Sequence, residues 1–159
     1  MTRVGFGYDV HPFAEDRRLV LGGVEIPSDR GLAGHSDADV LLHAIADALL
    51  GGAGLDDIGT HFPPSDERWR DANSRDLLAQ VRQLLTHHWR IVHIDATVIT
   101  EYPKIARYRE AMRAAIAETL GIGHDQINIK GKTNEHLGFI GRHEGICAVA
   151  AATLEEMSS

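Results

Sequence analysis

Residues 4–11 read VGFGYDVH, and this stretch predicts the strand from which the fold and the site can be built. Its β-branched and aromatic residues favour an extended backbone, and its glycines allow another part of the chain to approach closely. Alternate side chains of a strand point to the same side, so Asp9 and His11 share one face while Val10 points to the other. The sequence therefore predicts a strand that presents two potential metal ligands together.

The rest of the chain alternates between strand and helix patterns, with no internal repeat, low-complexity tract or linker. A hairpin is predicted around two consecutive glycines, at residues 19–26. Apolar spacing and capping residues predict helices over residues 37–50, 73–87 and 103–120. Further strands are predicted over residues 90–100, 126–133 and 145–154. This order predicts one α+β domain over residues 1–159, an α/β sandwich in which helices cover one face of a mainly four-stranded mixed sheet.

Composition and charge argue against several classes of protein. The formal net charge of −7 disfavours a nucleic-acid partner, because a phosphate backbone requires a basic surface. The apolar stretches are well short of the roughly 20 residues that span a bilayer, and the first residues do not resemble a secretory signal. Cys147 is the only cysteine, which excludes an internal disulfide. We therefore expect a cytoplasmic protein without nucleic-acid or membrane partners.

A third metal ligand is predicted in the helix over residues 37–50. Asp39, His43 and Asp47 stand four residues apart and form one polar row on an otherwise apolar helix. Such a row is costly unless it faces a metal, a cavity or a polar partner. Because catalytic zinc sites often use three histidine or carboxylate ligands, His43 is the candidate to join Asp9 and His11. Asp39 or Asp47 would then hold its imidazole. The alternative is a polar pair at a strand end and a hydrogen-bonded core histidine.

Two polar segments are candidates for phosphate binding. His35 and Ser36 precede the same helix, where Ser36 is a candidate N-cap and the unpaired backbone N–H groups suit phosphate oxygens. After a predicted strand, Thr133 is a hydrogen-bond donor for phosphate and Glu135 a ligand for a hard ion such as Mg²⁺. The alternatives are an ordinary helix cap and a polar turn at a strand end.

Together these motifs resemble the 2-C-methyl-D-erythritol 2,4-cyclodiphosphate synthase family of the non-mevalonate isoprenoid pathway. They occur in the family's order and span almost the whole chain, so the set is far more specific than any single motif. The segments that carry the resemblance are Gly7-Tyr8-Asp9-Val10-His11, Gly34-His35-Ser36-Asp37 with the helix that contains His43, Asp57-Ile58-Gly59, Pro103-Lys104, Lys132-Thr133-Asn134-Glu135, and Leu137-Gly138-Phe139 with Gly141-Arg142 and Glu144-Gly145.

The resemblance implies an activity and an assembly. The substrate would be 4-diphosphocytidyl-2-C-methyl-D-erythritol 2-phosphate, whose 2-phosphate attacks the β-phosphorus, releases CMP and closes a cyclic diphosphate. The family forms a homotrimer with active sites between subunits. The likeness implies Zn²⁺ held by Asp9, His11 and His43, and a second divalent cation, Mg²⁺ or Mn²⁺, held by Glu135 and substrate phosphates.

The resemblance also implies the other site residues. His35 and Thr133 would stabilise the transition state. The cytidine pocket would comprise Thr100, Pro103, Lys104, Ile105 and Ala106. The methylerythritol unit would contact Asp57, Ile58, Gly59, Phe62 and Asp66, although Pro64 stands where an acidic residue is expected. Further substrate contacts would come from Ser36, Lys132 and Asn134. Phe139 and Arg142 would line the trimer's central cavity, where an isoprenoid diphosphate could bind.

Two other functions are compatible with parts of this pattern. A zinc phosphoesterase would use metal-bound water on a nucleotide diphosphate, and its product would contain solvent oxygen. A non-catalytic trimeric carrier would use only the cavity near Phe139 and Arg142 for an isoprenoid diphosphate. The presence of all three candidate zinc ligands together with Glu135 argues against the carrier.

Overall fold

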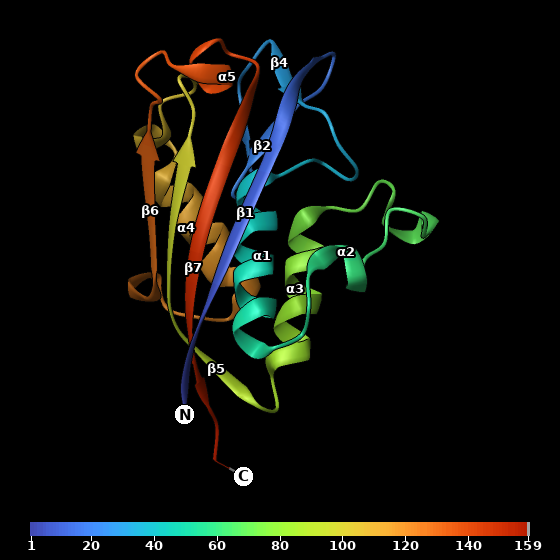
Figure 1. Cartoon of the computed structure of the whole chain (residues 1–159), viewed down its shortest axis with the longest axis vertical. Helices are drawn as coiled ribbons and strands as arrows, with labels where there is room; N and C mark the ends of the chain where they lie inside the picture. Colours follow the sequence, from blue (N-terminus) through green and yellow to red (C-terminus); the bar gives the residue numbers. More distant parts are fainter. Residues whose placement is uncertain (159) are drawn as a thin grey trace.

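The sheet is built around its long first strand, β1 (Thr2–Glu15), in a computed structural model that describes residues 1–158. β1 pairs antiparallel with β7 (Gly145–Glu156) on one side and with β4 (Arg30–Leu32) on the other. β7 also pairs antiparallel with β5 (Trp89–Ile99), which pairs parallel with β6 (Ile127–Lys132). The result is a mixed five-stranded sheet of order β4-β1-β7-β5-β6 (Figure 1).

The α+β class predicted from the sequence is confirmed, but the expected count of four strands is wrong. The additional strand is β4, whose three residues Arg30-Gly31-Leu32 are too few to show an alternating pattern in the sequence. The hairpin prediction is confirmed, because β2 (Leu19–Leu21) and β3 (Val24–Ile26) form a separate two-stranded sheet. The main sheet and the hairpin thus account for every predicted strand.

Three long helices lie on one face of the sheet (Figure 1). α1 (Val40–Ala53) packs against β1 and β7, α3 (Ser74–Leu85) packs against α1, and α4 (Arg109–Leu120) packs against α3 and β6. The shorter helical elements are α2 (Ile58–His61), α5 (Gly138–Gly141) and the 3₁₀ turns Glu67–Trp69, Ile105–Arg107 and His124–Gln126. No helix within residues 1–158 has the length and apolar character needed to cross a membrane.

Two predicted helix starts are wrong. α1 begins at Val40 rather than residue 37, because Asp39 and not Ser36 is its N-cap and accepts the N–H of Leu42. Ser36 instead has a positive φ of 59°, which continues the loop. Pro103 does not begin a helix either, because the turn Ile105–Arg107 intervenes before α4.

The glycines of β1 let α1 lie directly against the strand's backbone. A Cβ added at Gly7 would lie 1.8 Å from the carbonyl oxygen of Ala44, and one added at Gly5 would lie 1.8 Å from that of Ala48. No other residue type fits at these two positions without moving the helix. This close contact sets the position of His43, which is next to Ala44, relative to β1.

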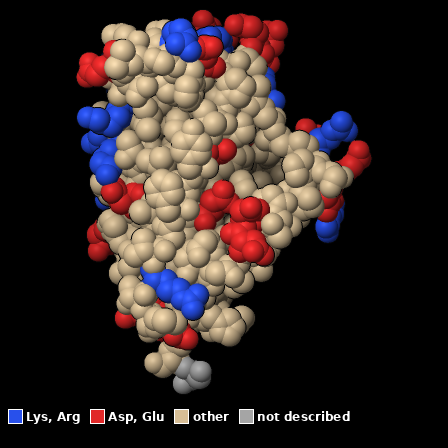
Figure 2. Space-filling view, viewed as in Figure 1, with Lys and Arg blue, Asp and Glu red and all other residues tan. Residues whose placement is uncertain are grey.

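The opposite face of β1 is apolar and open. Val4, Phe6, Tyr8 and Val10 are 69%, 68%, 52% and 38% exposed, and no helix in the described part of the chain covers them. The space-filling view shows mainly uncharged atoms over the middle of the sheet (Figure 2). A contiguous apolar surface of this kind is typical of an interface with another chain. We call these four residues the apolar face of β1.

Candidate active site

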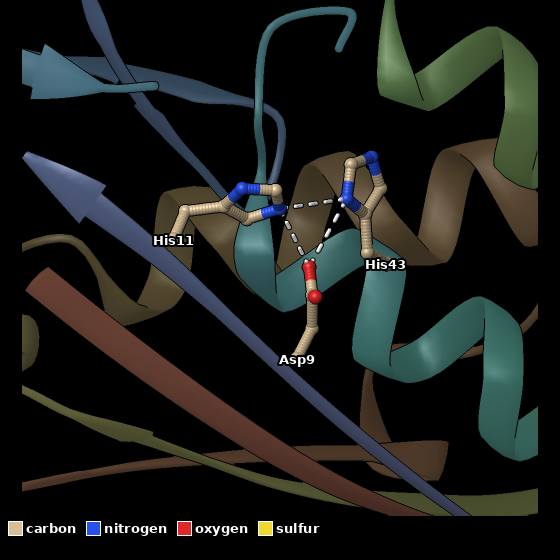
Figure 3. Close-up of side chains that lie close together, drawn as sticks. All are labelled: Asp9, His11 and His43. Atoms are coloured by element: carbon tan, nitrogen blue, oxygen red, sulfur yellow. Dashed lines mark hydrogen bonds and ion pairs between the residues drawn. The ribbon is translucent and has the colours of Figure 1, made fainter. Parts of the chain in front are cut away.

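Asp9 and His11 on β1 and His43 on α1 point toward one another (Figure 3). Asp9 Oδ2 lies 2.9 Å from His11 Nε2 and 3.1 Å from His43 Nδ1. The two ring nitrogens lie 3.4 Å apart. The three residues predicted as metal ligands therefore converge on one point, although 34 positions separate His43 from Asp9.

The hydrogen bond of His11 Nδ1 shows which ring nitrogen of this histidine is free to bind a cation. His11 Nδ1 lies 2.9 Å from the carbonyl oxygen of Ala33, which can only accept a hydrogen bond. Nδ1 therefore donates, and in the neutral ring Nε2 carries a lone pair toward Asp9 and His43. An imidazole lone pair and a carboxylate oxygen at 2.9 Å repel each other unless a cation lies between them.

The triad fits a divalent metal ion. A tetrahedral zinc ion with ligands at about 2.0–2.1 Å separates neighbouring ligand atoms by roughly 3.3 Å, close to the separations observed here. Burial raises the pKa of Asp9, but its contacts with His11 and His43 together outweigh burial and lower this pKa to about 2. The carboxylate is therefore ionised at neutral pH, as a metal ligand must be.

Asp39 and Asp47 do not hold the imidazole of His43, so this part of the prediction is wrong. Each carboxylate satisfies backbone N–H groups instead. Asp47 accepts from Ile58 at 2.8 Å, and the fully buried Asp39 accepts from Gly22, Gly23 and Leu42. Burial and the nearby charge of Asp37 raise the pKa of Asp39 to about 6. Of the three residues in the polar row, only His43 therefore belongs to the candidate metal centre. Asp39 and Asp47 make structural hydrogen bonds to the backbone.

The loop before α1 borders the candidate metal centre. Asp39 in this loop accepts the N–H of Leu42 with its own carboxylate, so this group of the first turn of α1 is already bonded. Gly34 lies so close to the ring of His11 that an added Cβ would be 2.7 Å from its Nδ1. In the same loop His35 is exposed, while Ser36 is partly buried and its Oγ lies 3.5 Å from Ser74 Oγ.

A second concave region lies where β5 and β6 end. A cavity of about 180 Å³ is lined by Thr100, Pro103, Lys104, Ile105, Ala106, Arg109, Gly131, Lys132 and Thr133. Seven of these nine residues are among the predicted substrate or catalytic residues. Sequence reasoning missed Arg109, which resembled an ordinary helix residue. It also missed Gly131, although a glycine inside a strand can indicate that a ligand or another part of the chain approaches its backbone closely. None of the three candidate metal ligands lines this cavity.

Glu101 joins the two loops of this region and was also missed. Its side chain is buried, and its Oε1 accepts the backbone N–H groups of Asn134 at 3.1 Å and His136 at 2.9 Å. Glu135 lies between these two donors, with a positive φ of 53°, and is exposed. The carboxylate thus shapes the loop after β6 that contains Thr133 and Glu135.

Residues predicted to bind the methylerythritol unit lie near α2. Asp57 caps α2 by accepting the N–H of Thr60, and Ile58 and Gly59 form the first turn. Phe62 follows the helix and packs edge-to-face on Trp69.

The remaining predicted residues are in local contacts. Asp66 pairs with Arg68 at 2.5 Å, and Pro64 is exposed beside this pair. Arg142 pairs with Glu144 at 2.7 Å, while Phe139 on α5 is 41% exposed. None of these side chains belongs to the cluster of Asp9, His11 and His43.

Comparisons with known proteins show the family to which the chain belongs. Residues 2–155 match the YgbB family. A 2-C-methyl-D-erythritol 2,4-cyclodiphosphate synthase of Rubrobacter xylanophilus is 56% identical over 156 residues, which cover 96% of this chain and 94% of that protein.

Two solved structures are each similar over 99% of the chain. The bifunctional IspDF from Campylobacter jejuni has a TM-score of 0.95 and 41% identity, with 43% of that longer chain covered. The CDP complex of IspF from Plasmodium falciparum has a TM-score of 0.87 and 37% identity, with 97% of that chain covered. On the full-length match and on the identity to its relatives, this chain belongs to the YgbB family.

Proposed function

We propose that the chain is a metal-dependent, CMP-releasing cyclase. It converts 4-diphosphocytidyl-2-C-methyl-D-erythritol 2-phosphate to 2-C-methyl-D-erythritol 2,4-cyclodiphosphate in isoprenoid precursor biosynthesis. The observation that carries the proposal is the convergence of Asp9, His11 and His43 in a member of this family. Metal identity is proposed as Zn²⁺, because two imidazoles and one carboxylate are typical of catalytic zinc sites that keep a position open.

The reaction needs positioning and charge neutralisation more than a strong base. A 2-phosphate oxygen bonds to the β-phosphorus, the bond from that phosphorus to the oxygen of the CMP phosphate breaks, and its electron pair leaves with CMP. No water is consumed. The nucleophile is already an anion, so the barrier comes largely from bringing two phosphates together. A bound divalent ion supplies positive charge that offsets this repulsion.

The residues around the two regions take separate roles in this proposal. His35, in the loop beside the metal ligands, and Thr133 stabilise the charge that develops in the transition state. Glu135, with substrate phosphates, holds the second cation, Mg²⁺ or Mn²⁺. The cavity lined by Thr100, Pro103, Lys104, Ile105 and Ala106 receives the cytidine, which the CDP bound to the Plasmodium falciparum relative supports. Further substrate contacts come from Ser36, Asp57, Ile58, Gly59, Phe62, Asp66, Lys132 and Asn134.

We infer that the working assembly is a homotrimer. The apolar face of β1 supports this, because burying such exposed side chains against copies of the chain is favourable. The absence of the candidate metal ligands from the nucleotide cavity's lining also supports a site completed by two subunits. Phe139 and Arg142 would face the central cavity and bind an isoprenoid diphosphate there.

Isotope labelling distinguishes the cyclase from a zinc phosphoesterase. The purified chain is incubated with the proposed substrate, Zn²⁺ and Mg²⁺ in ¹⁸O-labelled water. Mass spectrometry should find CMP and the cyclic diphosphate without label from solvent. A labelled, ring-open phosphate product would establish hydrolysis instead, and binding without any turnover would establish a carrier.

Glu101→Ala should reduce kcat/KM about 100-fold, because losing the acceptor for two backbone N–H groups displaces the loop that contains Thr133. Steady-state kinetics with the diphosphocytidyl substrate measures this change. Glu101→Gln is the matched control, since its amide oxygen can still accept both hydrogen bonds, and it should stay within about tenfold of wild type. Equal kinetics for the alanine and glutamine variants would show that the carboxylate's contacts do not position the loop.

A further inference from the structure

We propose that Ser74 is a positioning residue for the metal centre. Its hydroxyl, oriented by Asp37, fixes His43 in the tautomer that presents Nδ1 to the ion. This inference rests on the proposed metal centre and adds two residues that lie outside the triad. Ser74 is the first residue of α3, and Asp37 belongs to the loop before α1.

Ser74 is buried between α1 and the loop that precedes α1. It is 1% exposed, and its Oγ lies 3.0 Å from His43 Nε2. The same Oγ forms a hydrogen bond to Asp37 Oδ1, and the backbone N–H of Ser74 donates to Asp37 Oδ2 at 3.0 Å. The serine therefore contacts the histidine on one side and a carboxylate on the other.

The direction of these hydrogen bonds follows from the number of protons available. A carboxylate only accepts, so the single hydroxyl proton of Ser74 is donated to Asp37. The hydroxyl oxygen must then accept from His43 Nε2–H. A neutral imidazole protonated at Nε2 has its lone pair on Nδ1, the atom that faces Asp9 Oδ2 at 3.1 Å.

Asp37 is itself held in place. Its Oδ1 also accepts the backbone N–H of Asp39 at 3.1 Å, so both carboxylate oxygens have fixed partners. The orientation of His43 thus depends on a chain of contacts that joins α3, the loop before α1 and α1 itself. Partners of this kind raise the affinity of a histidine for metal and restrict the rotation of its ring.

Helix capping does not explain the buried hydroxyl. Asn73 is the N-cap of α3, and its side chain accepts the N–H of Arg75 at 2.8 Å. Ser74 follows the cap, where the helix needs no side-chain hydroxyl. Asn73 therefore provides a matched control that weakens the same helix start without touching His43.

The test measures Zn²⁺ affinity directly, by competition with a chromophoric chelator. Ser74→Ala should weaken binding about 10- to 100-fold, because the N–H of His43 loses its acceptor. It should also alter the visible absorption of the Co²⁺-substituted protein. Asn73→Ala should lower the melting temperature but leave Zn²⁺ affinity and the Co²⁺ spectrum unchanged. Ser74→Thr, which keeps the hydroxyl, should retain the wild-type spectrum.

A second variant tests the same inference if Ser74→Ala does not fold. In Asp37→Asn one carboxylate oxygen is replaced by an NH₂ group, so the side chain can no longer accept both the hydroxyl and the backbone N–H of Ser74 in their present geometry. This variant should weaken Zn²⁺ binding about tenfold. The inference is overturned if a folded Ser74→Ala protein binds Zn²⁺ as wild type does, or if Asn73→Ala weakens binding equally. Failure of the wild-type chain to bind Zn²⁺ would instead overturn the proposed function.

Discussion

His43→Ala should lower turnover by at least about 1,000-fold, the effect of losing roughly 4 kcal/mol of charge stabilisation in the transition state. The substitution removes one of three ligands, and Asp9 and His11 alone make a weak and mobile site. Zn²⁺ binding, measured by metal analysis after gel filtration, should fall below one ion per chain. Rate measurements with the diphosphocytidyl substrate give the turnover.

His87→Ala is the control for this variant. His87 is exposed just beyond the end of α3, and its side chain forms no hydrogen bond with the residues that the structure describes, so its loss should leave metal content and turnover unchanged. His43 is 8% exposed, and its replacement leaves a small cavity, so circular dichroism should confirm that the variant is folded. Wild-type turnover in folded His43→Ala protein would disprove the metal-dependent mechanism.

Gly7→Ala should destabilise the fold by about 4 kcal/mol or more, which lowers the melting temperature by roughly 8–16 °C. The added Cβ would lie 1.8 Å from the carbonyl oxygen of Ala44, and neither backbone can yield without moving α1 away from β1. Because His43 precedes Ala44, the same shift should separate the metal ligands and reduce Zn²⁺ affinity. Thermal denaturation and chelator competition measure the two effects.

Gly51→Ala is the matched glycine control, in the helix that Gly7 contacts. A Cβ at Gly51 would meet nothing within 4 Å, and alanine is favoured over glycine in a helix by about 0.5–1 kcal/mol. Gly51→Ala should therefore raise the melting temperature slightly. If Gly7→Ala melts as wild type does, the close contact between α1 and β1 is not required.

The metal ligands show how much of the candidate site the sequence could predict. The strand period placed Asp9 and His11 on one face, and the helical period placed His43 on a polar row. Both deductions agree with the structure. The row also suggested Asp39 and Asp47 as partners of His43, and this was wrong. Which acceptor a polar side chain meets depends on neighbours from other elements, and the sequence pattern of one helix does not contain them.

The contacts that sequence reasoning missed are all long-range. Ser74 lies 31 residues from His43, and Glu101 lies 33 residues from Asn134. Each appeared ordinary in its own segment, a helix-start serine and a glutamate after a strand. The strand β4 was missed for a related reason, because its pairing with β1 and not its composition defines it.

The sequence by itself determined the order of the long strands and helices, the shared face of Asp9 and His11, and the family resemblance, since these follow from local backbone geometry and from residue identity. Only the tertiary structure decided that α1 lies against the glycines of β1, which brings His43 to Asp9 and places Ser74 behind it. The reason is physical. Periodicity selects a face of one element, whereas close packing between elements selects which faces meet and which hydrogen-bond partners remain.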